Sequence, residues 1–265
     1  MLKFFAALIA IALTACGHAS PPQTSNRTCP RPQGLPEGKV LLFGEMHGSL
    51  EAPKLISDLA CSLSKSRDIA VGLEIDSHDQ ARIDGYLKSR GTTADVEKLT
   101  GSYFWQKGKD GRSSAAMLHL IENIRELRIE GHSISVFAFD DQPGSELERN
   151  VAIANGIRRF YSTRPNVQII ALMGNVHAMQ TEMTTSDGPL VPSGILLSDL
   201  NPVSILISYP AGTIWACMPN CGVHSLTPRN PVTGPSGFRE GAALGGYSHS
   251  FLLSSITASP PAMQQ

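Results

Sequence analysis

The sequence is poor in charge, has no excess of either sign and contains no long apolar run. Of its 265 residues, 17% are charged, with 22 Lys and Arg against 23 Asp and Glu. Such a balance does not suit a surface that neutralises many phosphates, so we expect no nucleic-acid partner. The longest uninterrupted apolar run covers residues 4–13, about half of the roughly 20 residues that a helix needs to cross a bilayer. A multi-span membrane protein is therefore excluded.

Three common catalytic and nucleotide-binding motifs are also missing. The chain has no Gly-x-Ser-x-Gly elbow, no Walker loop and no Gly-x-Gly-x-x-Gly. A serine hydrolase of the usual kind needs the first of these, and nucleotide or dinucleotide enzymes need the others. These absences count against all three classes.

The N-terminus has the pattern of an export signal. Lys3 precedes the apolar run, which ends in Leu13-Thr14-Ala15-Cys16, as the n-region, h-region and small-residue processing site of a secretory signal do. The sequence around Cys16 resembles a bacterial lipobox, which implies a signal peptide over residues 1–15 and lipidation of Cys16. The alternative is ordinary cleavage near Ala19. We expect a lipid-anchored protein of the bacterial cell envelope that faces the periplasm from the outer membrane.

Four cysteines remain after Cys16, an even number in an oxidising compartment, and they allow three pairings. We expect disulfides between Cys29 and Cys61 and between Cys217 and Cys221. The second pair brackets Met-Pro-Asn, a turn-like segment. A thiolate metal site at that C-x-x-x-C spacing is the alternative, which export makes less favourable.

The mature chain is predicted to be a tether followed by one α/β domain. Residues 16–38 are rich in Pro and polar residues without an apolar period, whereas residues 39–261 alternate short apolar runs with stretches of helical period. The apolar runs are Val40–Phe43, Ile69–Leu73, Ile134–Phe139 and Val167–Met173. Because they lack polar alternation, they resemble strands buried on both faces. We predict a three-layer α/β/α sandwich with a mostly parallel central sheet.

Helices are predicted where apolar residues recur at helical spacing, in residues 55–63, 117–127 and 147–157. In the last of these, Leu147, Val151, Ala154 and Ile157 form the stripe that we expect to face the core. Beyond residue 200, the runs 204–208 and 213–217 suggest a hairpin, 250–256 suggests an edge strand, and 228–246 suggests a long surface loop.

Titratable side chains follow each of the four predicted parallel strands. They are Glu45 and His47, Glu74 and Asp76, Asp140 and Asp141, and His177. In an open parallel sheet, the carboxyl ends of the strands point to one edge, where ligands bind. We therefore expect these groups to converge. For the aspartates taken singly, a helix N-cap is an equal alternative.

The two histidines share a motif, because both stand third after a glycine that closes a strand, as Gly-x-x-His. Together with Glu45 and Glu74, His47 and His177 form the predicted catalytic set. A histidine oriented by a carboxylate acts as a general base on water, because its pKa lies near the working pH. Alternatively, Glu45, His47 and His177 hold a divalent transition metal whose bound water is the nucleophile.

A second segment suggests a binding role. Aromatic residues 103–105 precede Arg112 and a predicted helix N-cap at Ser113 or Ser114. The guanidinium of Arg112 is suited to a substrate carboxylate or oxyanion. We expect Arg112 and the strand-end Asp140 to contact the substrate, with core packing of the aromatics and a solvated Arg112 as the alternative.

The motifs carry a resemblance to a known superfamily. At Gly44–Gly48, Leu73-Glu74 and Gly174–His177, and in the segment Ile256–Pro261, the chain resembles the superfamily of erythromycin esterase-like proteins, Tiki/TraB proteins and ChaN-like haem-uptake lipoproteins. Over most of residues 39–261, the resemblance implies a three-layer fold with both motifs and the glutamates along one cleft.

The resemblance implies different activities for the different branches. Esterase-like members are hydrolases that use a histidine and a glutamate, which fall on His47 and Glu74 here. Tiki members resemble metal-dependent proteases that use both motifs, and thus His47 and His177. ChaN-like members bind haem, and none of their haem ligands can be placed on this chain. Our first hypothesis is a hydrolase of esters or amides in small molecules or peptides, metal-dependent or not. The alternative is a haem-binding uptake lipoprotein.

Overall fold

A computed structural model describes residues 27–30, 33–141, 144–185, 188–242 and 244–263. The predicted signal peptide and Cys16 lie outside these residues. Eleven strands are assigned within them: β1 Val40–Glu45, β2 Ile69–Asp76, β3 Ile134–Asp140, β4 Gln168–Gly174, β5 Met183–Thr185, β6 Gly188–Leu190, β7 Val203–Ser208, β8 Gly212–Cys217, β9 Cys221–Leu226, β10 Gly237–Glu240 and β11 His249–Leu252.

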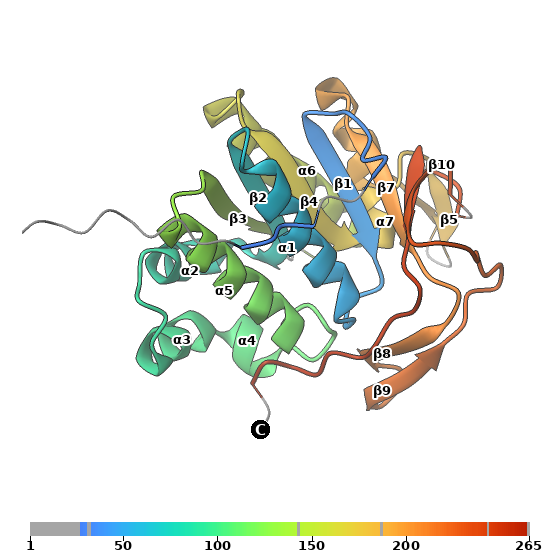
Figure 1. The fold of residues 1–265 in the computed structure, drawn as a ribbon. Helices are drawn as coiled ribbons and strands as arrows, with labels where there is room; N and C mark the ends of the chain where they lie inside the picture. Colours follow the sequence, from blue (N-terminus) through green and yellow to red (C-terminus); the bar gives the residue numbers. More distant parts are fainter. Residues whose placement is uncertain (1–26, 31–32, 142–143, 186–187, 243, 264–265) are drawn as a thin grey trace, which may run out of the picture.

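Seven of these strands form the central sheet, in the order β10-β11-β7-β1-β4-β2-β3 (Figure 1). All neighbours in it are parallel except β10 and β11. Strands β1, β2 and β4 are almost entirely buried, as their continuous apolar runs predict for strands covered on both faces. The predicted α/β class with a mostly parallel sheet is confirmed.

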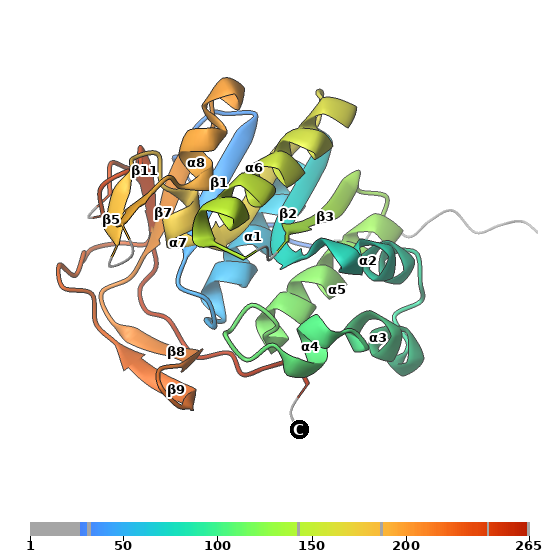
Figure 2. The ribbon, with the colours of Figure 1, turned by 180° about the vertical axis from the view of Figure 1, so that it is seen from behind.

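Helices cover both faces of this sheet. The helices are α1 Glu51–Leu63, α2 Gln80–Leu87, α3 Thr93–Thr100, α4 Tyr103–Lys107, α5 Ala115–Ile129, α6 Glu146–Thr163, α7 Asn175–Ala178 and α8 Ser193–Leu196, with 3-10 turns at Ser77–Asp79 and Ser198–Leu200. Helices α1 and α5 pack on one face with α2, α3 and α4 beside them (Figure 1), and α6, α7 and α8 pack on the other (Figure 2). Each face has its own apolar core.

The region after residue 200 differs from the prediction. Strand β7 joins the central sheet between β11 and β1 and does not pair with β8. Strand β8 pairs instead with β9, a strand that alternates exposed and half-buried residues, and this hairpin projects below the sheet in Figure 1. The predicted hairpin of 204–208 with 213–217 is therefore wrong, because β7, which is almost entirely buried, lies inside the central sheet.

The last part of the sheet also corrects the prediction. Strand β11 is not the edge, because β10 pairs with it on its outer side. Strand β10 lies within residues 228–246, which were expected to form only a surface loop. Its four residues are only partly buried, so the short run gives a weak apolar signal.

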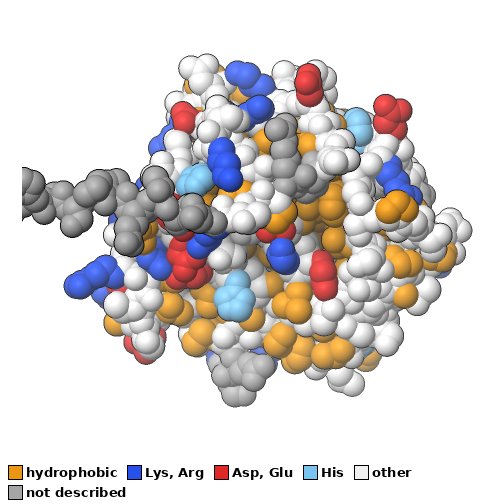
Figure 3. Space-filling model, viewed as in Figure 1, with side chains coloured by type: hydrophobic (Ala, Val, Ile, Leu, Met, Phe, Trp, Pro, Cys, Tyr) orange, Lys and Arg blue, Asp and Glu red, His pale blue; other side chains and the backbone are white. Residues whose placement is uncertain are grey.

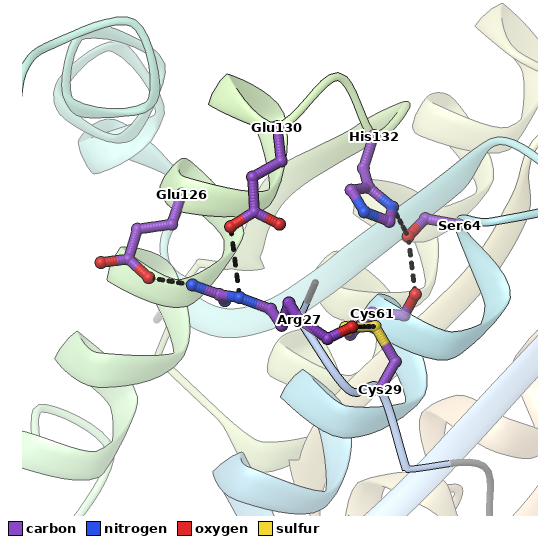
Figure 4. The surroundings of a disulfide bond; sticks show 7 residues. All are labelled: Arg27, Cys29, Cys61, Ser64, Glu126, Glu130 and His132. Carbon is purple, nitrogen blue, oxygen red and sulfur yellow. Dashed lines mark hydrogen bonds and ion pairs between the residues drawn. A yellow bond between two sulfur atoms is a disulfide. The ribbon is translucent and has the colours of Figure 1, made fainter. Parts of the chain in front are cut away.

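The disulfide Cys29–Cys61 fastens the N-terminal segment to α1 (Figure 4). Beside it, the guanidinium of Arg27 pairs with Glu126 and, at 3.3 Å, with Glu130, near the C-terminal end of α5. Residues 27–30 were expected to belong to the tether, but they are attached to the folded body. The tether prediction is otherwise untested.

The second predicted disulfide, Cys217–Cys221, closes the tip of the β8–β9 hairpin. Both predicted pairings are thus confirmed, and two disulfides indicate an oxidising, extracytoplasmic location. Among the described residues, no helix combines the length and the apolar character that crossing a membrane requires. Acidic and basic side chains are interspersed on the face that carries α1 and α5 (Figure 3).

The segment of residues 256–262 runs as a strap across the loops that follow β1 and α4. The N–H of Ser259 donates to the carbonyl of Gly48 at 2.8 Å, and the N–H of Ala262 donates to the carbonyl of Ser113 at 2.9 Å. In Figure 1 the strap passes from the β8–β9 hairpin toward α4. It therefore ties the first Gly-x-x-His loop to the loop that carries Arg112.

The two disulfides are expected to contribute unequally to stability. Cys29–Cys61 joins residues 32 apart and Cys217–Cys221 joins residues 4 apart. On loop entropy alone, their removal costs about 3–4 and about 2 kcal/mol of unfolding free energy. Urea denaturation of the Cys29→Ser/Cys61→Ser and Cys217→Ser/Cys221→Ser proteins measures both values. A larger loss from the hairpin pair would contradict the expectation.

Candidate functional site

The fold brings the ends of four adjacent strands to one edge of the sheet. Glu45 ends β1, Asp140 ends β3, Gly174 ends β4 and Glu74 lies near the end of β2. These strands are neighbours in the order β1-β4-β2-β3 and all run parallel. Their side chains therefore meet although the residues lie far apart in the chain.

His47 lies between two buried glutamates. Its Nδ1 is 3.2 Å from Glu45 Oε1 and its Nε2 is 3.5 Å from Glu74 Oε2. Both glutamate side chains are almost fully buried, whereas the imidazole is 20% exposed. With an acceptor at each nitrogen, the ring is suited to carry both protons.

The charge of His47 follows from these contacts. Burial alone lowers its pKa, but the charge of Glu74 and the hydrogen bonds to both carboxylates outweigh burial and raise the pKa to about 10. His47 is therefore an imidazolium at neutral pH. This pKa lies above the working pH, and the role of His47 as the general base stays a prediction.

The two glutamates differ in their surroundings. Burial raises the pKa of Glu45, and the hydrogen bond and charge of His47 offset this only partly. One of its oxygens, Oε2, is buried without a hydrogen-bond partner among the described residues. For Glu74, burial also raises the pKa, but the positive charges of His47 and Arg149 outweigh it and hold the pKa well below its usual range.

Glu74 is an anion with a full set of donors. Its Oε2 accepts the backbone N–H of Gly174 at 2.6 Å. Its Oε1 accepts from Arg149 and, at 3.4 Å, from Arg112. Such hydrogen bonding to the charged form favours ionisation. Glu74 is thus better placed to hold its neighbours in position than to take up a proton.

His177 belongs to the same group but is bonded as a neutral ring. Its Nδ1 lies 2.9 Å from Asn150 Oδ1, an oxygen that already accepts from the backbone N–H of Ser193. Its Nε2 lies 2.9 Å from a guanidinium nitrogen of Arg149, which can only donate. His177 therefore carries its proton on Nδ1, and burial lowers its pKa.

Arg149, on α6, lies in this site although no sequence motif indicated it. It bonds Glu74, His177 and both oxygens of Asp140. The predicted core stripe of α6 included Leu147 and Val151, which are exposed, whereas Asn150 and Ile153 are buried. The true buried face is rotated relative to the prediction, and Arg149 and Asn150 lie beside the site. Arg149 and Asn150 lie at helical spacing from Ile153 and Ile157, and this spacing could have indicated that they are on the buried side of α6.

Arg112 and Asp140, which were predicted to contact the substrate, lie at the site and form ion pairs with other side chains of the protein. Arg112 contacts Asp140 at 2.6 Å and Asp110 at 2.6 Å. Asp140 has no exposed surface and joins the two arginines to the sheet edge. A substrate contact by Asp140 does not fit this burial, and the predicted substrate role of Arg112 stays a prediction.

The predicted metal ligands do not fit a metal centre. Both nitrogens of His47 face carboxylates, and Nε2 of His177 accepts from the cationic Arg149. A metal ion bound between His47 and His177 would lie beside the positively charged guanidinium of Arg149. Within the described residues, the group whose donor atoms all lie within 4.8 Å is a different one, Asp76, His78 and Asp141. In that group, His78 is exposed and already bonded to Asp76.

The glycines of the two motifs are required by close approach. A Cβ on Gly174 would lie 3.1 Å from His47 Nε2, and a Cβ on Gly44 would overlap the hydroxyl of Tyr247. The glycine at position 174 lets the second motif pack against the imidazole of His47. The glycine at position 44 leaves room for Tyr247, whose hydroxyl donates to the carbonyl of Asn175.

Comparisons with known proteins identify the fold. The sequence matches no protein-family model and no curated protein. The structure is similar to that of a mutant of the erythromycin esterase EreC in its open conformation, with a TM-score of 0.61 and 11% identity over 85% of this chain and 93% of that chain. It is also similar to a succinoglycan biosynthesis protein, with a TM-score of 0.59 and 10% identity over 84% and 90%.

These similarities confirm the fold that the superfamily resemblance implied. A haem-binding ChaN of Campylobacter jejuni aligns with a TM-score of 0.37 and 14% identity over 65% of this chain and 82% of that chain. At that score the alignment supports no argument about this chain.

Arg149 is expected to be a major contributor to stability. Arg149→Met leaves the buried carboxylates of Glu74 and Asp140 with one cation fewer, and breaking a buried pair costs about 3–5 kcal/mol. Arg158, also on α6, pairs with the exposed Asp199. Its replacement by Met is the control and should cost no more than about 1 kcal/mol. Equal losses in urea denaturation at pH 7 would contradict this account.

Proposed function

We propose that the chain is a hydrolase of ester or amide bonds that works without a metal ion. The observation that carries the proposal is the set Glu45, His47 and Glu74: an imidazolium held between two buried carboxylates, one of which keeps an unpartnered oxygen. A buried carboxylate with a free oxygen is suited to bind and deprotonate water. Among these three side chains, His47, at 20% exposure, is the one that solvent reaches.

In this proposal Glu45, rather than His47, is the general base. Burial raises the pKa of Glu45 toward the working pH, which improves a carboxylate as a proton acceptor. The hydrogen bond and the positive charge of His47 lower the pKa of Glu45 and so oppose the effect of burial. His47 is thus a charged partner of the base, and Glu74 and His177 are positioning residues.

The proposed reaction needs one water molecule and one proton acceptor. Water attacks the carbonyl carbon, its oxygen forms the new C–O bond, and Glu45 Oε2 accepts the released proton. The carbonyl electron pair moves to oxygen, where the charge of the adjacent His47 stabilises it. As the carbonyl re-forms, the bond to the leaving group breaks and Glu45 returns the proton to that group.

The hydrolase proposal is preferred to the haem-binding alternative. A haem iron needs the lone pair of a side chain such as imidazole. Both nitrogens of His47 and Nε2 of His177 are engaged by other side chains. The similarity of fold to an erythromycin esterase supports hydrolysis as the class of reaction.

The same proposal places the enzyme in the bacterial envelope, lipid-anchored through Cys16. The N-terminal export pattern supports it, as do the two disulfides. The anchor would keep the domain at a membrane facing the periplasm, where the substrate is a small molecule or a peptide.

Replacing the base should abolish turnover without unfolding the protein. Glu45→Gln keeps the shape but removes the proton acceptor, so kcat toward a panel of nitrophenyl esters and anilides should fall by about 100- to 10,000-fold. His78→Gln, at an exposed histidine with one carboxylate partner, is the matched control and should leave kcat unchanged. Full activity in Glu45→Gln would overturn the assignment of the base.

The pH profile separates the two possible bases. If Glu45 is the base, kcat/KM falls on the acid side, as the pH drops through a pKa raised above 4.5. It falls again on the alkaline side, as His47 loses its proton near pH 10. If neutral His47 were the base, kcat/KM would instead rise up to about pH 10.

In His47→Gln the cation beside Glu45 is lost, so the acid limb should move to higher pH. An unmoved acid limb in this variant would contradict the role of His47 as the charged partner of Glu45.

A further inference from the structure

A pocket of about 320 Å³ opens beside the site, at the carboxyl ends of β1 and β7. Met46, which precedes His47, and Asn175, which follows Gly174, form part of its wall. Both Gly-x-x-His loops therefore contribute to the pocket as well as to the site. Its volume is at the lower end of the range of about 300–1,000 Å³ for small-molecule sites, which limits the occupant to a small group.

The interior of the pocket is apolar with one unsatisfied polar atom. Leu206 and Ile207 of β7 and Val232 supply apolar surface. Ser208 also lines the pocket, is 8% exposed, and its Oγ has no hydrogen-bond partner among the described residues. Buried hydroxyls are normally bonded, whereas this oxygen is buried in the wall of the pocket without a partner among the described residues.

Tyr209 links the pocket to the site. Its side chain is buried and lines the pocket, and burial together with the charge of Glu45 raises its pKa to about 12. The hydroxyl thus remains protonated and lies within the field of the proposed base. Met46, the neighbour of Glu45 in the chain, lines the same pocket.

The outer part of the pocket carries a positive charge. Arg229, in the segment between β9 and β10, lines the pocket and is exposed. Its guanidinium makes no ion pair with any residue that the structure describes. An uncompensated cation at the rim of an apolar pocket favours a ligand with an apolar body and an anionic end.

We propose that this pocket binds the non-reacting arm of the substrate, and that this arm is a short apolar chain or ring ending in an anionic group. The substrate is then an ester or amide whose scissile group lies at Glu45 and whose carboxylate, or comparable anion, lies at Arg229. The position of the reacting end rests on the proposed hydrolase function. The binding preference of the pocket is independent of that function.

Binding is tested with three probes of one chain length, namely hexanoate, hexanol and hexylamine, by calorimetry on the full chain. Hexanoate should bind about two- to fivefold more tightly than hexanol, as an exposed ion pair allows, and hexylamine should bind most weakly. In Arg229→Glu the order of hexanoate and hexylamine should reverse. Arg90→Glu, at an exposed arginine outside the pocket, should keep the wild-type order. Equal affinities for the three probes, no binding, or the same order in both variants would overturn the proposal.

Hydrolysis is measured in parallel with monomethyl adipate, methyl hexanoate and methyl 6-aminohexanoate. Cleavage in the order anion, neutral ester, cation supports both proposals. Charge-selective binding of the probes without cleavage of any ester contradicts the hydrolase function and leaves the pocket assignment standing. Cleavage with no charge preference, together with equal binding of the probes, overturns the pocket assignment and leaves the hydrolase function standing.

Discussion

The carboxylate of Glu74 lies at the centre of the sheet edge and accepts hydrogen bonds from Arg149, Arg112 and the backbone N–H of Gly174. A buried carboxylate is stable as an anion only with such partners. Because Glu74 is anionic, the pKa of His47 is raised, and the charge of His47 in turn lowers the pKa of Glu45 against the effect of burial. Each of these groups thus influences the ionisation of the next, from the arginines to Glu45.

The hydrogen bonds distinguish Glu45, the proposed base, from the residues that position its neighbours. Glu74 bonds Arg149 and the backbone N–H of Gly174, and Arg149 also bonds Asp140, whereas Oε2 of Glu45 has no partner among the described residues. Hydrogen bonds that are already formed need no reorganisation when charge develops on a substrate, which is the main source of electrostatic catalysis. The rigid part of the site lies on strands and on α6, and the open part lies toward the pocket beside β7.

Much of this arrangement was predictable from the sequence, and what was missed has physical reasons. The buried strands and their parallel direction follow from continuous apolar runs separated by helices, and with them the meeting of Glu45, Glu74 and Gly174. Arg149 was missed because α6 has apolar residues on more than one side, so the stripe does not identify the buried face. The protonation of His47 was not predictable, since it depends on two distances of 3.2 and 3.5 Å to carboxylates. The partner of β8 was missed because strand pairing is decided by burial in the assembled sheet.

The strap of residues 256–262 has a consequence for how the chain can be shortened. Every side chain of the proposed catalytic group precedes residue 178, so a fragment that stops after β9 would still contain all of them. It would nevertheless lack the N–H groups of Ser259 and Ala262 that bond Gly48 and Ser113, and the carbonyl of Gly48 would keep only the N–H of Trp215 from β8. Domain boundaries chosen only to retain the motifs would thus remove part of the backbone hydrogen bonding that holds the loop of His47.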